Sequence, residues 1–181
     1  WPEQAQDEVW GASADTLIGS SFVFPAGRAE RVEGGYRLAG RWPFSSGIDP
    51  CQWVQLGAMV TTAPGTAPER RYFLLPRRDY TIHDTWRVAG LQGTGSKDVS
   101  TDGAFVPAYR TVAYDDMLQA TSPGLESNPQ ALYRFPIWAA GGYVLVSTLY
   151  GAALGALERF AAKARQTTAQ SSGQGLSGHV T

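Results

Sequence analysis

The fold is decided by residues 33–47, which read EGGYRLAGRWPFSSG. The pair Gly34-Gly35 separates two runs, residues 28–33 and 36–41, whose short mixture of apolar and polar side chains is typical of strands. Two adjacent glycines permit positive φ at both turn positions. The stretch therefore predicts a β-hairpin.

Strand signals continue on both sides of this hairpin, from residue 17 to about residue 113. They are short β-branched and aromatic runs separated by Gly and Pro clusters. Seven or so strands with no intervening helix predict an antiparallel sandwich or barrel. The expected strands cover residues 21–24, 28–33, 36–41, 52–62, 70–75, 80–88 and 99–106.

The two ends of the chain have a different character. Residues 1–10 predict about two turns of helix. Residues 137–157 carry no charge and lead directly into the charged segment 158–165. That length meets the simplest test for a membrane span, but the many small residues and the helical pattern that continues into the charged segment favour a helix buried in a bundle or oligomer interface. The polar stretch 166–181 and the start of the chain lead us to expect a fragment.

Composition excludes several classes of protein. The chain has 181 residues, with 15 basic and 16 acidic side chains and no long run of either sign, so it offers no electrostatic footprint for nucleic acid. A single cysteine, Cys51, removes both a disulfide framework and a CxxC-type zinc site, and it favours a reducing cytoplasm. With only His83 and His179, we expect no transition-metal centre.

Three local motifs carry little chemistry. The glycine-rich segment 90–98 has Ser96 at the position where a phosphate loop needs its lysine, and Asp98 stands where a dinucleotide fingerprint needs its third glycine, so we interpret it as an inter-strand loop. Cys51 lies in an apolar strand, where a free cysteine is usually inert. His83 is expected on a strand, facing solvent or paired with a carboxylate, and a role as general base is disfavoured.

Residues 40–47 remain as the candidate site. Two aromatic rings and two hydroxyls lie at the end of a strand between Pro43 and Gly47. Such a turn can offer a flat apolar wall together with hydroxyl and backbone hydrogen bonds, which suits a planar heteroaromatic ligand. The alternative is a bulged strand end with Trp42 and Phe44 in the core.

Four stretches of the chain, taken together, resemble a known family. They are residues 33–47, 53–58, 84–99 and 105–107 with Arg110-Thr111. In combination they are similar to the middle domain of the flavin-dependent monooxygenases built on the acyl-CoA dehydrogenase fold. These are the oxygenase components of two-component aromatic hydroxylases of the 4-hydroxyphenylacetate and steroid-phenol type. The resemblance covers roughly residues 1–165.

The resemblance implies an architecture. The family has an N-terminal helical domain, a central β-barrel and a C-terminal helical bundle that forms a tetramer. Residues 1–16 would end the first domain, 17–114 would form the β-barrel, 115–135 would connect, and 136–181 would begin the bundle. We therefore expect a mainly antiparallel β-barrel or sandwich of this middle-domain type, flanked by pieces of two α-helical domains.

The resemblance also implies a reaction. A separate flavin reductase would deliver reduced flavin, FMN or FAD, which reacts with O2 to give a C4a-hydroperoxyflavin that hydroxylates a small phenolic substrate. The enzyme would be cytoplasmic, without nucleic-acid or membrane partners. Alternatives are N- or S-oxygenation, acyl-CoA dehydrogenation, or a non-catalytic β domain with a scaffolding role.

Site residues are carried over from the same resemblance. Ser45 would be the catalytic hydroxyl facing flavin N5, where it can donate or accept a hydrogen bond. Thr94, Ser96 and Lys97 would contact either the cofactor or another subunit. No general base can be assigned, because neither histidine matches its position. The expected cofactor-binding residues are Phe24, Pro25, Trp42, Pro43, Phe44, Ser45 and Ser46.

Overall fold

The computed structural model describes residues 1–61, 65–135 and 137–166, and the chain divides into two units, Trp1–Pro136 and Ile137–Thr181. The helices of the first unit are α1 (Glu3–Trp10) and α2 (Tyr114–Leu118), with short 3-10 turns η1 (Phe24–Ala26), η2 (Arg77–Asp79), η3 (Gln92–Thr94), η4 (Ala108–Arg110), η5 (Pro123–Leu125) and η6 (Ala131–Arg134). Its strands are β1 (Ile18–Ser21), β2 (Gly27–Val32), β3 (Gly35–Ser45), β4 (Trp53–Val60), β5 (Glu69–Pro76), β6 (Thr81–His83), β7 (Lys97–Pro107) and β8 (Thr111–Ala113).

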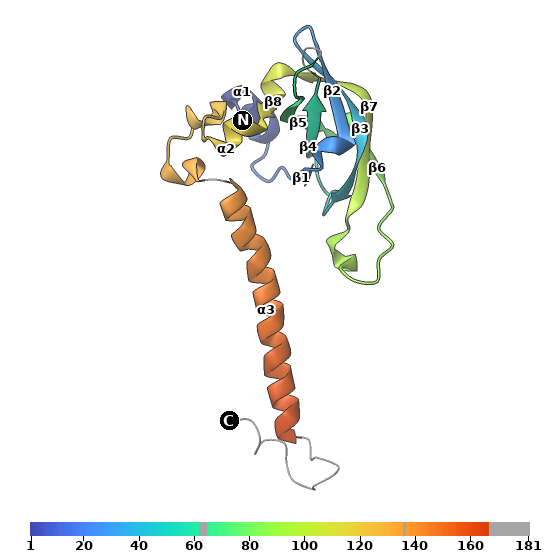
Figure 1. Cartoon of the computed structure of the whole chain (residues 1–181), viewed down its shortest axis with the longest axis vertical. Coiled ribbons are helices and arrows are strands. Elements are labelled where there is room, and N and C mark those ends of the chain that lie inside the picture. The colour runs from blue at the N-terminus through green and yellow to red at the C-terminus, as the bar shows by residue number, and fades with distance from the viewer. Residues whose placement is uncertain (62–64, 136, 167–181) are drawn as a thin grey trace. The chain divides into compact units, whose positions relative to one another are not determined.

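Among the described residues, these eight strands form one sheet (Figure 1). Their order is β6-β7-β3-β2-β4-β5-β8, and β1 pairs with β4. Most pairs are antiparallel, as the sequence predicts, but β1 and β2 each run parallel to β4. In the part of the chain that the structure describes, β6 and β8 are not partners, so the sheet is open. Closure into a barrel is therefore not confirmed.

The predicted hairpin is confirmed, with a shifted turn. In β2 and β3, Val32 pairs with Gly35 in antiparallel register, so the turn consists of Glu33 and Gly34. Gly34 has a φ of 75°, whereas Gly35 is the first residue of β3. Only one turn position uses positive φ, and the second glycine instead lies against the backbone of Val106.

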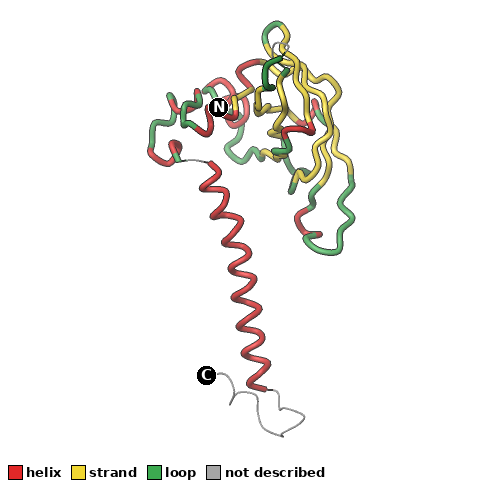
Figure 2. The backbone as a smooth tube through the Cα atoms, in the orientation of Figure 1, coloured by secondary structure: helices red, strands yellow, loops and turns green. Residues whose placement is uncertain are grey.

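Two expected strands are wrong in extent. The run 21–24 is a strand only at Ser21, because Phe24 begins a 3-10 turn that includes Pro25. The run 80–88 is a strand only at 81–83. Beyond it the chain leaves the sheet in a long loop that returns through η3 to β7, and Figure 2 shows this loop projecting past the strands.

Trp42 organises the main core. Its side chain is fully buried, and its indole Nε1 donates a hydrogen bond of 2.6 Å to the carbonyl oxygen of Gly57 on β4. The ring lies against Gly27, where a Cβ atom would overlap it. The same core contains Leu38, Val54, Leu56, Phe73, Leu75, Val99 and Val106.

Helix α1 packs on the sheet through a second, smaller cluster. Val9 of the helix contacts Trp53 of β4 and Leu74 of β5. Beside them, Glu8 accepts hydrogen bonds from the nearly buried guanidinium of Arg110, one of them from Nε at 2.6 Å. The hydrogen bond from Arg110 lowers the pKa of Glu8.

The second unit contains α3 (Ile137–Gln166). Large apolar side chains of this helix are exposed, among them Tyr143, Leu149, Tyr150 and Phe160. Within the described residues, the segment Gly141–Gln166 is long and apolar enough to cross a membrane by length and composition alone. A core helix of a soluble assembly passes the same test, so this property does not choose between the two interpretations.

Candidate functional site

The candidate site begins with a bulge at the end of β3. Trp42 pairs with Val99 and Ser45 with Lys97, so two residues of β3 face one residue of β7. Phe44, inside the bulge, has a φ of 63°, a left-handed conformation that is rare for an aromatic residue. Bulges of this kind redirect side chains and occur beside functional sites. Here the bulge turns the Phe44 ring outward, where it is 63% exposed.

Aromatic and backbone contacts hold this bend. The Phe44 ring meets the ring of Trp86 edge-on, with 6.3 Å between centroids. Ser21 of β1 donates a hydrogen bond of 2.7 Å from Oγ to the carbonyl oxygen of Pro43. The interaction with Ser21 was not evident from the sequence, because β1 pairs with β4 and not with β3, and Ser21 and Pro43 are separated by 22 positions in the chain.

Ser45 is buried beside the bulge. Its side chain is 0% exposed, and its Oγ has no hydrogen-bond partner among the described residues. A buried hydroxyl without a partner costs free energy, so such an atom points to a function or to a partner that the chain does not itself supply.

A chain of hydroxyls runs from the bend to the loop before β7. Ser46 Oγ lies 2.8 Å from Ser96 Oγ, which in turn lies 2.8 Å from Thr94 Oγ1. The backbone N–H of Gly47 donates to the carbonyl oxygen of Thr94 at 2.9 Å. Ser46 is exposed and Ser96 is buried. The structure thus joins residues 44–47 and 94–96, which sequence reasoning had placed in separate motifs.

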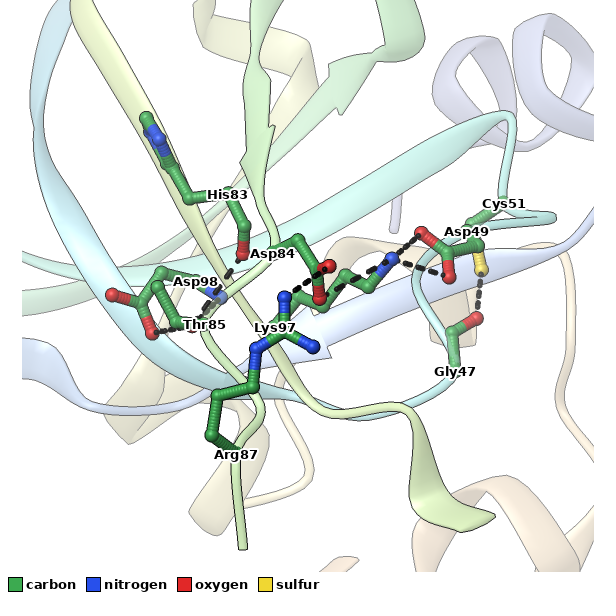
Figure 3. A network of polar contacts seen from close by, with 9 residues as sticks. All are labelled: Gly47, Asp49, Cys51, His83, Asp84, Thr85, Arg87, Lys97 and Asp98. Atoms are coloured by element: carbon green, nitrogen blue, oxygen red, sulfur yellow. Dashed lines mark hydrogen bonds and ion pairs between the residues drawn. The ribbon is translucent and has the colours of Figure 1, made fainter. Parts of the chain in front are cut away.

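Lys97 anchors the same region through charge. Figure 3 shows its ammonium group between two carboxylates, with Nζ 2.9 Å from Asp49 and 4.0 Å from Asp84. The hydrogen bond to Asp49 raises the pKa of Lys97. Arg87 also pairs with Asp84 at 3.1 Å, so this network ties both ends of the β6–β7 loop to the loop after β3.

The other predicted cofactor residues lie in different environments. Phe24 is almost buried, with its ring against Tyr72 and Tyr114, while Pro25 beside it is exposed. Trp42 is enclosed by the core, so its indole is not on the surface in this structure. Of the set, Pro25, Phe44 and Ser46 are exposed, and Pro43 is partly exposed.

The remaining reactive side chains have ordinary surroundings. His83 Nε2 lies at hydrogen-bond distance, 2.7 Å, from Ser100 Oγ of β7. This partner differs from the solvent or carboxylate that we expected. Burial raises the pKa of the Cys51 thiol, which disfavours the nucleophilic thiolate. The described residues contain no group of three or more His, Cys, Asp or Glu able to hold a metal ion. His179 lies outside the described residues.

Several proteins are similar to this chain in sequence. No protein-family model matches the chain. It is 39% identical over 156 residues to the flavin-dependent monooxygenase oxygenase subunit HsaA of Rhodococcus jostii, which is 86% of this chain and 40% of that protein. It is 37% identical over 161 residues to the oxygenase component of an FADH2-dependent resorcinol hydroxylase of Rhizobium, covering 88% of this chain and 39% of that protein.

A solved structure shares the fold. XiaF from Streptomyces, determined in complex with FADH2 and glycerol, matches with a TM-score of 0.78 and 31% identity, over 97% of this chain and 44% of that one. The chain spans about two fifths of the length of the relatives it matches. Sequence and fold agree: the homologues and structural neighbours of this chain are oxygenase components of flavin-dependent monooxygenases, and the chain covers part of each of them.

Proposed function

We propose that the chain forms part of the oxygenase component of a monooxygenase that hydroxylates a small phenolic substrate. The observation that carries this proposal is the 39% identity over 156 residues with the HsaA subunit of Rhodococcus jostii. The resorcinol hydroxylase component from Rhizobium supports a phenolic substrate class. Bound reduced flavin, FMN or FAD, would supply the chemistry by activating O2, and a separate reductase would supply the reduced flavin.

The bend at residues 43–47, which we call the Phe44 bend, fits the planar ring system of a flavin. It combines an exposed aromatic side chain, the exposed hydroxyl of Ser46 and the buried, unpartnered hydroxyl of Ser45. An apolar wall with a few placed hydrogen-bonding groups is what a heteroaromatic cofactor needs. In this proposal Phe44, Pro43 and Pro25 contribute apolar surface, and Ser46 contributes a hydrogen bond.

Ser45 is proposed as the catalytic hydroxyl on the same basis. Its Oγ has no hydrogen-bond partner in the described part of the chain, which supports the role, because a ring nitrogen of the cofactor would satisfy it. Since the atom is enclosed in the structure, the bulge must shift for direct contact. Trp42 and Phe24 would support the site from beneath, since both side chains are buried. Thr94, Ser96 and Lys97 would hold the loop that lies against residues 44–47.

The wider assembly belongs to the same proposal. Residues 1–16 would end a preceding helical domain, 17–114 would form the middle domain, which closes toward a barrel, 115–135 would connect, and 136–181 would begin a helical bundle. The exposed apolar side chains of α3 support burial in a homotetramer. We also propose a cytoplasmic location, because one cysteine in 181 residues leaves no disulfide framework.

A chimera tests the proposed function directly. Residues 1–166 would replace the matching stretch of the Rhodococcus subunit, and the purified protein would be mixed with reduced flavin, a phenol and ¹⁸O2. We expect one ¹⁸O atom in the hydroxylated product, detected by mass spectrometry. In the same chimera, Ser45→Ala should lower the yield of product per flavin oxidised.

Ser127→Ala, in an exposed loop, is the matched control and should leave the yield unchanged. A folded chimera that binds reduced flavin but releases only hydrogen peroxide would contradict the proposal. Equal yields from Ser45→Ala and Ser127→Ala would remove Ser45 from the mechanism.

A further inference from the structure

The hydroxyl chain at the Phe44 bend has a direction. Thr94 Oγ1 donates to the carbonyl oxygen of Leu91 at 2.9 Å, and two further oxygen–oxygen contacts of 2.8 Å join Thr94 to Ser96 and Ser96 to Ser46. Two oxygens this close need a proton between them. Three contacts thus require three protons, and the three hydroxyls carry one each.

Only one arrangement of these protons satisfies all three contacts. A carbonyl oxygen has no proton to give, so the contact with Leu91 uses the proton of Thr94. The contact between Ser96 and Thr94 then uses the proton of Ser96, and the contact between Ser46 and Ser96 uses the proton of Ser46. All three O–H groups point in the same direction along the row of hydroxyls, from the exposed Ser46 toward Leu91.

From this we infer that Ser46 can only accept a hydrogen bond from a ligand, because it donates its own proton to Ser96. We call it an acceptor-only hydroxyl, and it selects ligands that present an N–H or O–H donor. Its proton is committed to the buried Ser96, so only oxygen lone pairs face outward from this exposed residue. A carbonyl or an unprotonated ring nitrogen placed there would meet lone pairs and be repelled. Thr94, which never touches the ligand in this scheme, is the positioning residue that sets the direction.

The inference deepens the proposed function and rests on it for the identity of the ligand. Reduction adds a proton to a flavin ring nitrogen that has none in the oxidised form, which changes that atom from acceptor to donor. An acceptor-only hydroxyl therefore favours the reduced cofactor over the oxidised one. Ser45 cannot discriminate in this way, because an unpartnered hydroxyl rotates to donate or to accept.

The variant Thr94→Val tests this without changing Ser46. It removes the terminal donor, so Ser96 becomes free to donate to Ser46, and the proton of Ser46 can turn outward. Thr94→Ser keeps the hydroxyl and is the matched control. Dissociation constants for reduced and oxidised FMN are measured anaerobically on the 181-residue chain by NMR titration, which also follows weak binding.

We expect tighter binding of reduced FMN by the natural chain and by Thr94→Ser. In Thr94→Val the ratio of the two dissociation constants should fall about fivefold, as expected for one neutral hydrogen bond. A variant that weakens both forms equally would show that Thr94 only supports the loop, and it would overturn the inference.

A second measurement needs no ligand. Neutron diffraction from crystals of the deuterium-exchanged chain locates the hydroxyl deuterons, and we expect that of Ser46 on the line to Ser96 and that of Ser96 on the line to Thr94. The reverse direction overturns the inference whatever binds. If neither form of FMN binds while the deuterons lie as expected, FMN is ruled out as the ligand of the bend in this chain, and the acceptor-only assignment of Ser46 is supported.

Discussion

At the scale of single residues, Ser45 and Ser21 form a natural comparison. Both side chains are buried, yet Ser21 donates a hydrogen bond of 2.7 Å to Pro43, while Ser45 has no partner among the described residues. The same truncation should therefore have opposite effects on stability. We expect Ser21→Ala to lower the free energy of unfolding by about 1 kcal/mol.

Ser45→Ala removes an unsatisfied hydroxyl, so it should leave the free energy of unfolding unchanged or raise it by about 1 kcal/mol. Urea unfolding of the two variants measures both values. A loss of stability in Ser45→Ala equal to that in Ser21→Ala would mean that Ser45 has a hydrogen-bond partner in solution, and that its role as an open polar group is wrong.

Gly27 is a second residue whose environment predicts a clear result. A Cβ atom at this position would overlap the buried indole ring of Trp42. Because Trp42 is enclosed and hydrogen-bonded to Gly57, the ring cannot move without disturbing the core. We expect Gly27→Ala to destabilise the protein by about 2 kcal/mol, as overpacking does in other cores.

Gly93→Ala is the control for Gly27→Ala, since a Cβ atom there meets nothing within 4 Å among the described residues. Thermal unfolding of the two variants separates a steric effect from a general preference for glycine. Equal melting temperatures for the two variants would contradict the packing that the structure gives Trp42.

At the scale of elements, α1 depends on the ion pair between Glu8 and Arg110. The carboxylate is partly exposed, but the guanidinium is nearly buried and also lies over the ring of Trp53. Removing the carboxylate leaves a buried cation without its partner. We expect Glu8→Gln to lower the free energy of unfolding at pH 7 by about 2 kcal/mol.

The pH dependence of this pair follows from the lowered pKa of Glu8. A carboxyl whose pKa is lower in the folded than in the unfolded state stabilises the fold above the unfolded value, near 4.5, and this contribution is lost as pH falls through the folded value. The stability difference between the natural chain and Glu8→Gln should therefore shrink from pH 6 to pH 3. Gln4→Ala, in the exposed first turn of the same helix, removes no titrating group, so its stability difference from the natural chain should stay constant over this pH range. Parallel stability curves for the natural chain and Glu8→Gln would contradict the role of the pair.

At the scale of the whole molecule, the chain spans about two fifths of the length of its relatives. Its candidate site has exposed Phe44 and Ser46 and no covering element among the described residues of the first unit. We therefore expect weak flavin binding by the 181-residue chain compared with the complete Rhodococcus subunit. Isothermal titration of both proteins with reduced FMN tests this, and stoichiometric, tight binding by the chain alone would refute it.

The sequence by itself determined the mainly antiparallel β class, the hairpin around Gly34 and the similarity to flavin-dependent monooxygenase oxygenase components, while it left open whether residues 40–47 form a bulged strand end. These features depend on local backbone preferences and on contiguous motifs. Only the tertiary structure decided that β1 and β2 run parallel to β4, that Trp42 is enclosed, and that Ser46, Ser96 and Thr94 form one chain of hydroxyls. The physical reason is that pairing direction, burial and hydrogen-bond polarity arise between residues distant in sequence, where the register of one strand on another places the side chains.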